Sequence, residues 1–321
     1  MNLIDKFGSV RILIIGDVML DHYVHGSVTR ISPEAPVPIL DVTRSEYYLG
    51  GSGNVLLNIK SMGGKADIIT MTGEDIHGDM IDELISEHSN NSFVLKDRLR
   101  KTTLKSRYIS GSNQLFRVDE ESKDYLDPLL EEKIISVFND TFLNYDCILI
   151  EDYNKGLLTP GIIKNVISRC NSSGIPVIVD PKIFNVPSYS GCKLLKPNLY
   201  EFSIMTGLDC SDLDLTELEV HARQFISDNN IDSMLVTLSD KGLIYVDVNE
   251  SVYDPGYPMD VYDVSGAGDT VISILALCMV SNIDIKKSLS ICNIAASIAC
   301  SKSGIASVGI NEILNSKFYT F

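Results

Sequence analysis

Short apolar runs rich in β-branched residues recur along the chain and predict buried strands. The first spans residues 10–15 and ends at Gly16 and Asp17. Similar runs follow at residues 67–72, 146–150, 176–180, 192–196 and 233–238. Apolar residues at helical spacing lie between them, and the chain after residue 265 has a helical pattern. Strands that alternate with amphipathic helices predict an α/β fold, in which a mostly parallel central sheet is covered by helices on both faces.

Two segments interrupt this alternation. Residues 18–45 include three prolines between positions 33 and 38, and proline is confined to sheet edges and loops because it cannot donate to a ladder. Residues 104–110 and 114–119 are strand-like runs joined by Gly111-Ser112-Asn113, which suits a hairpin turn. We therefore expect a single domain over residues 1–321 that carries a small β-strand lid, built from segments at about 18–45 and 95–119. The lid would cover a site, form a dimer contact, or do both.

The composition narrows the function. The chain is 45% hydrophobic and has a net charge of −16, which fits a folded core and argues against a nucleic-acid or anionic-membrane partner. No apolar run reaches the roughly 18–20 residues that span a bilayer, and the N-terminal segment does not resemble a signal peptide. The seven cysteines contain no C-x-x-C pair, which indicates a reduced, cytoplasmic protein. P-loop and dinucleotide-binding glycine motifs are absent from the sequence.

The motif Asp263-Val-Ser-Gly-Ala-Gly-Asp269 precedes an apolar helical run and is the sharpest chemical signal. Small residues let a ligand approach the backbone, and the free N–H groups of a helix N-terminus attract anions. A carboxylate beside that cradle suits a base that accepts a proton from an attacking hydroxyl. The alternative is a glycine-rich loop with an acidic helix cap.

Three further motifs allow both a functional and a structural interpretation. Leu49-Gly-Gly-Ser-Gly-Asn54 could hold a sugar or simply begin a helix, and the structural interpretation is favoured when the motif is taken alone. Lys196-Pro-Asn198-Leu-Tyr-Glu201 could lie near nucleotide phosphates and their magnesium, or form a helix capping box. Residues 236–242, a strand followed by a small-residue turn, could line a nucleotide or be a turn.

Taken together, the glycine pair near residue 50, the Asn-x-x-Glu at residue 198 and the Gly-Ala-Gly-Asp near residue 266 resemble the ribokinase-like (phosphofructokinase-B type) sugar kinases. The match covers essentially the whole chain. It implies a three-layer ribokinase-like sandwich and the cofactors ATP and Mg²⁺. A closer similarity, carried by Thr29-Arg-Ile-Ser-Pro-Glu-Ala-Pro-Val-Pro38, is to the kinases that phosphorylate O1 of D-glycero-D-manno-heptose 7-phosphate in the ADP-heptose route to surface polysaccharide. No H-x-G-H motif of a fused nucleotidyltransferase domain is present, so we expect none.

The resemblance also implies roles for individual residues. Asp269 would be the base, and the amides of Gly266, Ala267 and Gly268 the anion hole. The nucleotide would lie against Asn198, Leu199, Tyr200, Glu201, Thr237, Ser239, Gly242 and Asn293, with Glu201 meeting Mg²⁺ through water. The sugar phosphate would be held by Asp17, Asp21, Gly50, Gly51, Asn54, Arg107, Arg117, Asp152, Lys155 and Lys182. Arg30 is a further candidate cation, and for any one cation ordinary surface charge is the alternative.

The chain departs from the heptose kinases at Glu151, where they have serine, at Val264 and Ser265, where the family usually has a threonine, and at Ser52-Gly53-Asn54, where they have Ala-Ala-Asn. The open alternatives are another sugar or sugar-phosphate kinase of this fold and a non-catalytic sugar-phosphate binder. The net charge does not exclude an anionic substrate, because acidic residues concentrate at 119–132 and 209–219 and basic residues at 96–107. A homodimer through the lid strands is expected.

Overall fold

The computed structural model describes residues 3–89, 91–111, 113–209, 214–258, 261–302, 304 and 306–320. Its large sheet has the strand order β13-β12-β11-β10-β9-β8-β1-β4-β5. In chain order these strands are β1 (Arg11–Gly16), β4 (Lys65–Gly73), β5 (Phe93–Asp97), β8 (Cys147–Glu151), β9 (Val177–Asp180), β10 (Leu194–Leu195), β11 (Ser233–Thr237), β12 (Leu243–Asp247) and β13 (Ser251–Asp254). Neighbours from β5 to β11 pair in parallel, whereas β12 and β13 add an antiparallel edge.

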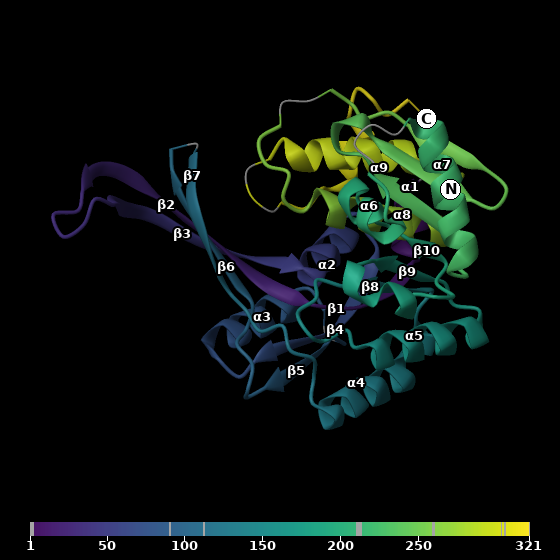
Figure 1. The fold of residues 1–321 in the computed structure, drawn as a ribbon, viewed down its shortest axis with the longest axis horizontal. Helices are drawn as coiled ribbons and strands as arrows, with labels where there is room; N and C mark the ends of the chain where they lie inside the picture. The colour runs from purple at the N-terminus through teal and green to yellow at the C-terminus, as the bar shows by residue number, and fades with distance from the viewer. Residues whose placement is uncertain are drawn as a thin grey trace.

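Helices cover both faces of this sheet, and Figure 1 shows the resulting layers. One core contains side chains from α1 (Leu3–Gly8), α2 (Ser52–Ser61), α3 (Ile76–Ser86), α8 (Ala267–Val280), α9 (Ile285–Cys300) and α10 (Ile310–Leu314). The other contains side chains from α4 (Pro128–Thr141), α5 (Pro160–Ser173), α6 (Leu199–Thr206) and α7 (Leu215–Asp228). Strand β1 feeds both cores, because Ile12 and Ile14 face one layer and Leu13 and Ile15 face the other. The predicted α/β sandwich is confirmed.

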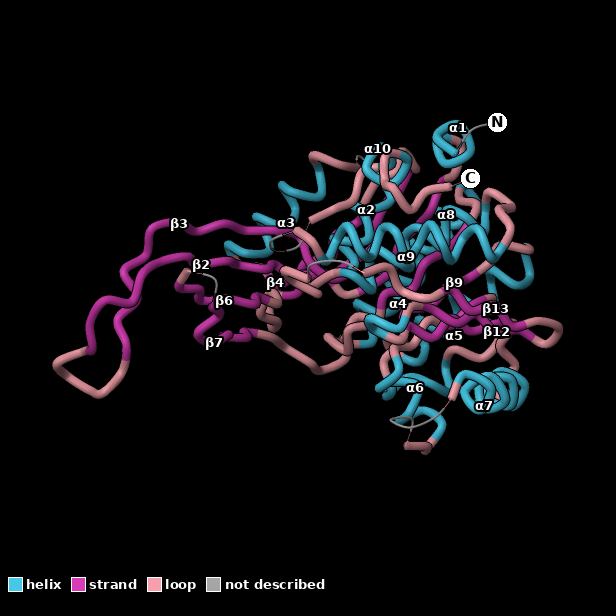
Figure 2. The backbone as a smooth tube through the Cα atoms, turned by 90° about the horizontal axis from the view of Figure 1, so that it is seen from above, coloured by secondary structure: helices cyan, strands magenta, loops and turns pink. Residues whose placement is uncertain are grey.

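The second sheet has four strands in the order β3-β2-β6-β7. They are β2 (Val18–Ile31), β3 (Pro38–Gly51), β6 (Leu104–Ser110) and β7 (Asn113–Glu120), and they extend away from the body as a lid (Figures 1 and 2). The proline-containing segment leads into β3, which is an edge strand of this sheet. This position suits proline, because proline has no backbone N–H to donate to a neighbouring strand. Ser112 of the expected hairpin turn lies outside the described residues, although the flanking strands pair as expected.

The bounds of the lid differ from those expected. Residues 93–97 form β5, which pairs in parallel with β4 in the large sheet, so the second lid segment begins at Leu104 rather than at about 95. The first lid segment extends to Gly51 instead of 45, because β2 and β3 pair along nearly their whole length. The run expected at 192–196 gives only the two-residue strand β10. Among the described residues, no helix combines the length and apolar character needed to cross a membrane.

Candidate active site

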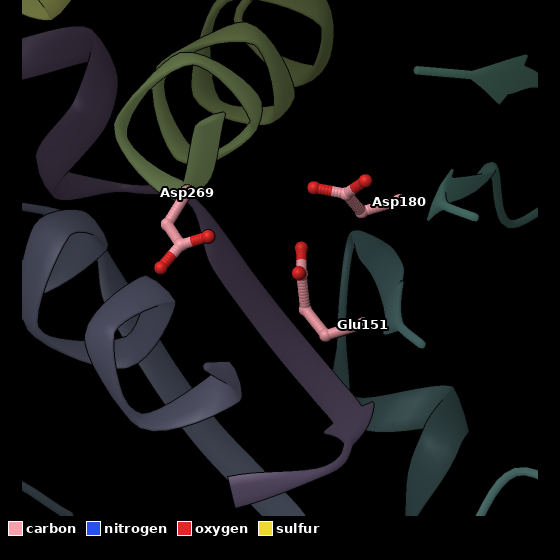
Figure 3. Close-up of side chains that lie close together, drawn as sticks. All are labelled: Glu151, Asp180 and Asp269. Atoms are coloured by element: carbon pink, nitrogen blue, oxygen red, sulfur yellow. The ribbon is translucent and has the colours of Figure 1, made fainter. Parts of the chain in front are cut away.

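Polar side chains meet where three parallel strands end beside one helix. Gly16 ends β1, and the register places Glu151 of β8 beside it and Asp180 of β9 beside Glu151. Asp269 lies in the first turn of α8, and Figure 3 shows its carboxylate close to those of Glu151 and Asp180. The carboxyl ends of parallel strands are where α/β folds bind ligands. The arrangement joins residues that lie far apart in the sequence.

The start of α8 has the form expected of an anion cradle. Gly266 adopts a left-handed conformation with φ of 79°, which a glycine reaches without strain. The Ala267 amide donates to the carbonyl oxygen of Val264 at 3.3 Å, so an anion would draw mainly on the following amides of the first turn. A side chain at Gly268 would stand 3.4 Å from the Lys196 ammonium. The loop therefore presents amides and one cation to the same small space.

The carboxylate of Asp269 is buried and held by two donors. Asn54 Nδ2 donates to one oxygen at 2.7 Å and the Tyr153 hydroxyl donates to the other at 2.5 Å. Asn58 in turn donates to the side-chain oxygen of Asn54 at 3.1 Å, which fixes the amide orientation. Burial raises the pKa of Asp269 to about 6, although both hydrogen bonds favour its charged form. Asp269 is thus a buried carboxylate of fixed orientation whose raised pKa meets a requirement for a general base.

Asp17 and Asp152, both expected among the substrate residues, accept hydrogen bonds that organise the loop carrying Tyr153. Asp17 accepts the backbone N–H groups of Tyr153 and Lys155 at 3.0 Å and that of Leu157 at 3.3 Å. Burial raises its pKa to about 6. Asp152 accepts from the Asn154 N–H, Asn185 Nδ2 and Tyr189 hydroxyl, each at 2.7 Å. With these bonds made, both carboxylates hold the loop in the conformation that aims Tyr153 at Asp269.

A buried ion pair lies at the base of the lid. Arg107 of β6 pairs with Asp21 of β2, and its guanidinium lies 5.1 Å from the ring centre of Tyr23. A side chain at Gly50 would come within 1.9 Å of a carboxylate oxygen of Asp21. Gly51 has φ of +57° and lies against the Asp17 carbonyl. The glycine pair therefore allows the start of α2 and the base of the lid to approach the Asp17 carbonyl and the Asp21 carboxylate closely.

The remaining candidate cations all contact carboxylates. Arg117, on the exposed strand β7, pairs with Asp119, and Arg30 at the far end of the lid pairs with Asp41 at 3.6 Å. The Lys155 ammonium lies 2.5 Å from Glu121. Lys182 pairs with Glu201 and lies 5.4 Å from the ring centre of Tyr153. Lys182 therefore lies beside Tyr153 at the site, whereas Arg30 lies at the far end of the lid and Arg117 lies opposite Arg107 on the exposed strand β7.

A cavity of about 520 Å³ adjoins the start of α8 and is large enough for much of a nucleotide. Its lining includes Thr237, Ser239, Gly242, Gly268 and Asn293. Four of these were expected against the nucleotide, and Gly268 was expected in the anion hole. The cavity thus places four of the eight expected nucleotide residues next to the expected phosphate site.

The segment 198–201 fits its structural interpretation. Asn198 accepts the Glu201 N–H at 2.8 Å and Glu201 accepts the Asn198 N–H at 3.0 Å, which is a reciprocal capping box on α6. Leu199 lines a different cavity, and Tyr200 is exposed. Each Glu201 oxygen already has one partner, a backbone amide or Lys182, and keeps a further lone pair for a water. Glu201 thus fits a water-mediated contact with Mg²⁺.

Sequence reasoning missed four residues of this site: Tyr153, Glu151, Asp180 and Lys196. The Lys196 ammonium is buried and lies 2.8 Å from Asp180. Burial, with the neighbouring charges of Asp180 and Asp269, raises the pKa of Glu151 well above its usual range. Asp180 and Lys196 end predicted strands, and Glu151 and Tyr153 follow the predicted strand 146–150 within three residues. A polar side chain at or just after the end of a predicted strand was therefore the sequence feature that could have identified these residues.

The chain matches known carbohydrate kinases. The model of the pfkB family of carbohydrate kinases matches residues 10–311. The bifunctional protein HldE of Nitratiruptor sp. is 38% identical over 303 residues, which are 94% of this chain and 64% of that protein. The HldE of Campylobacter fetus is 37% identical over 96% of this chain and 66% of that protein. The chain thus spans about two thirds of the length of these relatives.

Solved structures show the same fold. Phosphofructokinase-2 of Escherichia coli, in complex with substrates and products, superposes with a TM-score of 0.78 at 19% identity, over 95% of this chain and 97% of that one. Ribokinase of Arabidopsis thaliana, complexed with ribose and ATP, gives 0.73 at 19% identity over 97% and 99%. The chain belongs to the pfkB family of carbohydrate kinases, has the ribokinase-like fold and is an ATP-dependent sugar phosphotransferase, as its motifs predicted.

Proposed function

We propose that this pfkB-family kinase transfers the γ-phosphoryl group of ATP to O1 of D-glycero-D-manno-heptose 7-phosphate. The product is the 1,7-bisphosphate, a precursor of ADP-heptose for surface polysaccharide. The observation that supports phosphoryl transfer most strongly is Asp269, held by Asn54 and Tyr153 beside the nucleotide-sized cavity. Two observations favour the heptose: the segment at residues 29–38 and the similarity to HldE proteins over nearly the whole chain.

The chain's own residues supply a base for the sugar hydroxyl, and amides and an ammonium group for the transferring phosphoryl group. Ionised Asp269 accepts the proton of the sugar hydroxyl as that oxygen attacks the γ-phosphorus. Asn54 and Tyr153 keep the carboxylate aimed at the hydroxyl. The first-turn amides of α8 and the Lys196 ammonium, which stand on the same side, stabilise charge on the transferring group. Mg²⁺ bound with ATP neutralises phosphate charge, and Glu201 would meet it through water.

The lid supplies the cations for the sugar phosphate. Arg107 lies buried beside the site, and Lys105 of the same strand lies 6.0 Å from the ring centre of Tyr153. Burial lowers the pKa of Lys105, which leaves it responsive to an anionic partner. Closure of the lid would bring Arg117 toward the sugar and toward Lys155 of the loop after β8, and would exclude water, which limits the loss of ATP to hydrolysis. The six described cysteines are free, which fits a cytoplasmic location for this ATP-dependent reaction.

A panel of sugar phosphates tests the substrate. With Mg-ATP, we expect turnover of D-glycero-D-manno-heptose 7-phosphate to exceed that of fructose 6-phosphate, ribose and nucleosides by at least about a hundredfold in kcat/KM. Phosphorus NMR of the product should show a new anomeric phosphate. Preference for another sugar would replace the heptose with that substrate, and a lack of turnover with every sugar would favour the non-catalytic binder.

Replacement of the base tests the mechanism. Asp269→Asn should lower kcat by roughly 10²- to 10⁴-fold, because the amide cannot accept the proton. The affinity for ATP, measured by calorimetry, should stay within a few-fold of wild type. Asp232→Asn, an exposed carboxylate at the opposite end of the sheet, should leave kcat unchanged. Near-wild-type turnover of Asp269→Asn would exclude Asp269 as the base.

The lid also suits a homodimer. Strand β7 is exposed along its described length, and the large apolar side chains Val42, Phe116 and Val118 are about half exposed on this sheet. Apolar side chains gathered on an extended sheet mark a surface that another chain can cover. Sedimentation equilibrium should give twice the 35.4 kDa chain mass for the wild type and the single mass for the double variant Phe116→Lys, Val118→Lys. Leu129→Lys on α4, the control, should remain dimeric. A monomeric wild type would contradict this assembly.

A further inference from the structure

A polar cavity of about 490 Å³ lies where the central strands of the large sheet begin, at the opposite ends from the candidate active site. Arg11 begins β1 and Lys65 begins β4, and the two residues are partners in the strand register. Since β1 runs from Arg11 to Gly16 at about 3.3 Å per residue, roughly 17 Å separate the cavity from the strand ends at the active site. The volume is typical of a pocket for a small ligand.

Three cations line this cavity. Lys60, in the last turn of α2, joins Arg11 and Lys65 there. Several exposed cations elsewhere on this acidic chain contact a carboxylate, as Lys193 contacts Asp232 at 3.1 Å. Within the part of the chain that the structure describes, the three cations of the cavity form no ion pair of this kind. Their positive charge is therefore gathered in one place and left without a carboxylate partner, which favours an anion.

The carboxylates that line the cavity do not neutralise these cations. Asp67 is buried and accepts hydrogen bonds from the Ser89 hydroxyl and, at 2.9 Å, from the Tyr145 hydroxyl. The Arg11 guanidinium lies 5.6 Å from the ring centre of Tyr145, so it contacts an aromatic face. Glu87, the C-cap residue of α3, is the other carboxylate of the lining. Because both Asp67 oxygens are engaged by hydroxyls, three cations face the cavity against one uncommitted carboxylate.

The remaining polar lining consists of Ser86, His88 and Asn91, which can hydrogen-bond the hydroxyl groups of a ligand. Lysine and arginine side chains are the usual partners of phosphate. We propose that this cavity binds the phosphate group of a small phosphorylated metabolite, with Arg11, Lys60 and Lys65 as its cations. The site lies outside the active site and does not depend on which sugar the kinase phosphorylates.

A single tryptophan can report binding at this cavity alone, because the chain has no tryptophan of its own. Fructose 1,6-bisphosphate should change the fluorescence of Ser86→Trp saturably, with half-saturation at about 1 mM or below. In the same background, the double variant Lys60→Gln, Lys65→Gln should raise the half-saturation concentration at least about tenfold. The matched control Lys164→Gln, Lys286→Gln removes two exposed cations from other helices and should leave the response unchanged.

Inorganic phosphate and metal-free ADP, titrated in the same way, distinguish the sources of the phosphate group. Tighter binding of the bisphosphate supports a sugar phosphate as the ligand, and tighter binding of ADP supports a nucleotide. Added salt should weaken every response, because the attraction is between charges. Asn91→Trp is a second reporter in case the first tryptophan blocks the cavity.

The proposal is overturned if neither reporter protein responds saturably to any of the three ligands. It is equally overturned if the variant without the two cavity lysines responds as the parent reporter does. A protein that is inactive on the heptose but keeps a lysine-dependent response would contradict the proposed function and leave this anion site standing.

Discussion

The burial of the Asp269 carboxylate at the start of α8 is the constraint on which the rest of the site depends. A carboxylate taken out of water is stable only where donors and neighbouring charges are fixed around it. Asn54 comes from the helix that follows the lid, and Tyr153 comes from the loop after β8. Asp17 holds that loop through three backbone amides. The two oxygens of the Asp269 carboxylate therefore connect α8 to the helix after the lid and to the loop after β8.

The same constraint explains how an acidic protein can handle anionic ligands. The chain has a net charge of −16, but the positive elements around the site are few and fixed in position. They are the helix N-terminus, the buried ion pair of Arg107 with Asp21, and the Lys196 and Lys182 ammonium groups. Arg107, Lys196 and Lys182 each pair with a carboxylate that fixes the position of the cation. Local placement, more than net charge, thus determines which ligands the protein can bind.

The sequence was sufficient for the sandwich, for the lid and for the position of Asp269 at the start of a helix, because each depends on local pattern: apolar runs, prolines, and glycines before a helix. It was less informative about contacts between distant segments. Asp17 and Asp152 were expected at the sugar, yet they bind the backbone of the loop at residues 152–157, which only the folded chain brings to them. Glu201 was expected to meet the metal through water, and the structure shows that it also forms the capping box of α6. Glu151 and Asp180 become neighbours only through strand register. Residue type indicated that these side chains form polar contacts, but the groups that they contact depend on the tertiary structure.

The pH dependence of kcat/KM in wild type and Tyr153→Phe tests the central role of Asp269 most directly. Burial raises the pKa of Asp269 to about 6, so below that pH the base is protonated and kcat/KM should fall about tenfold per pH unit. The Tyr153 hydroxyl bond lowers this pKa, so its removal should move the acidic limb to higher pH. The substrate phosphate, with its second pKa of about 6, titrates equally in both assays and cancels from the comparison. Superimposed acidic limbs, or a limb displaced to lower pH in Tyr153→Phe, would contradict the account.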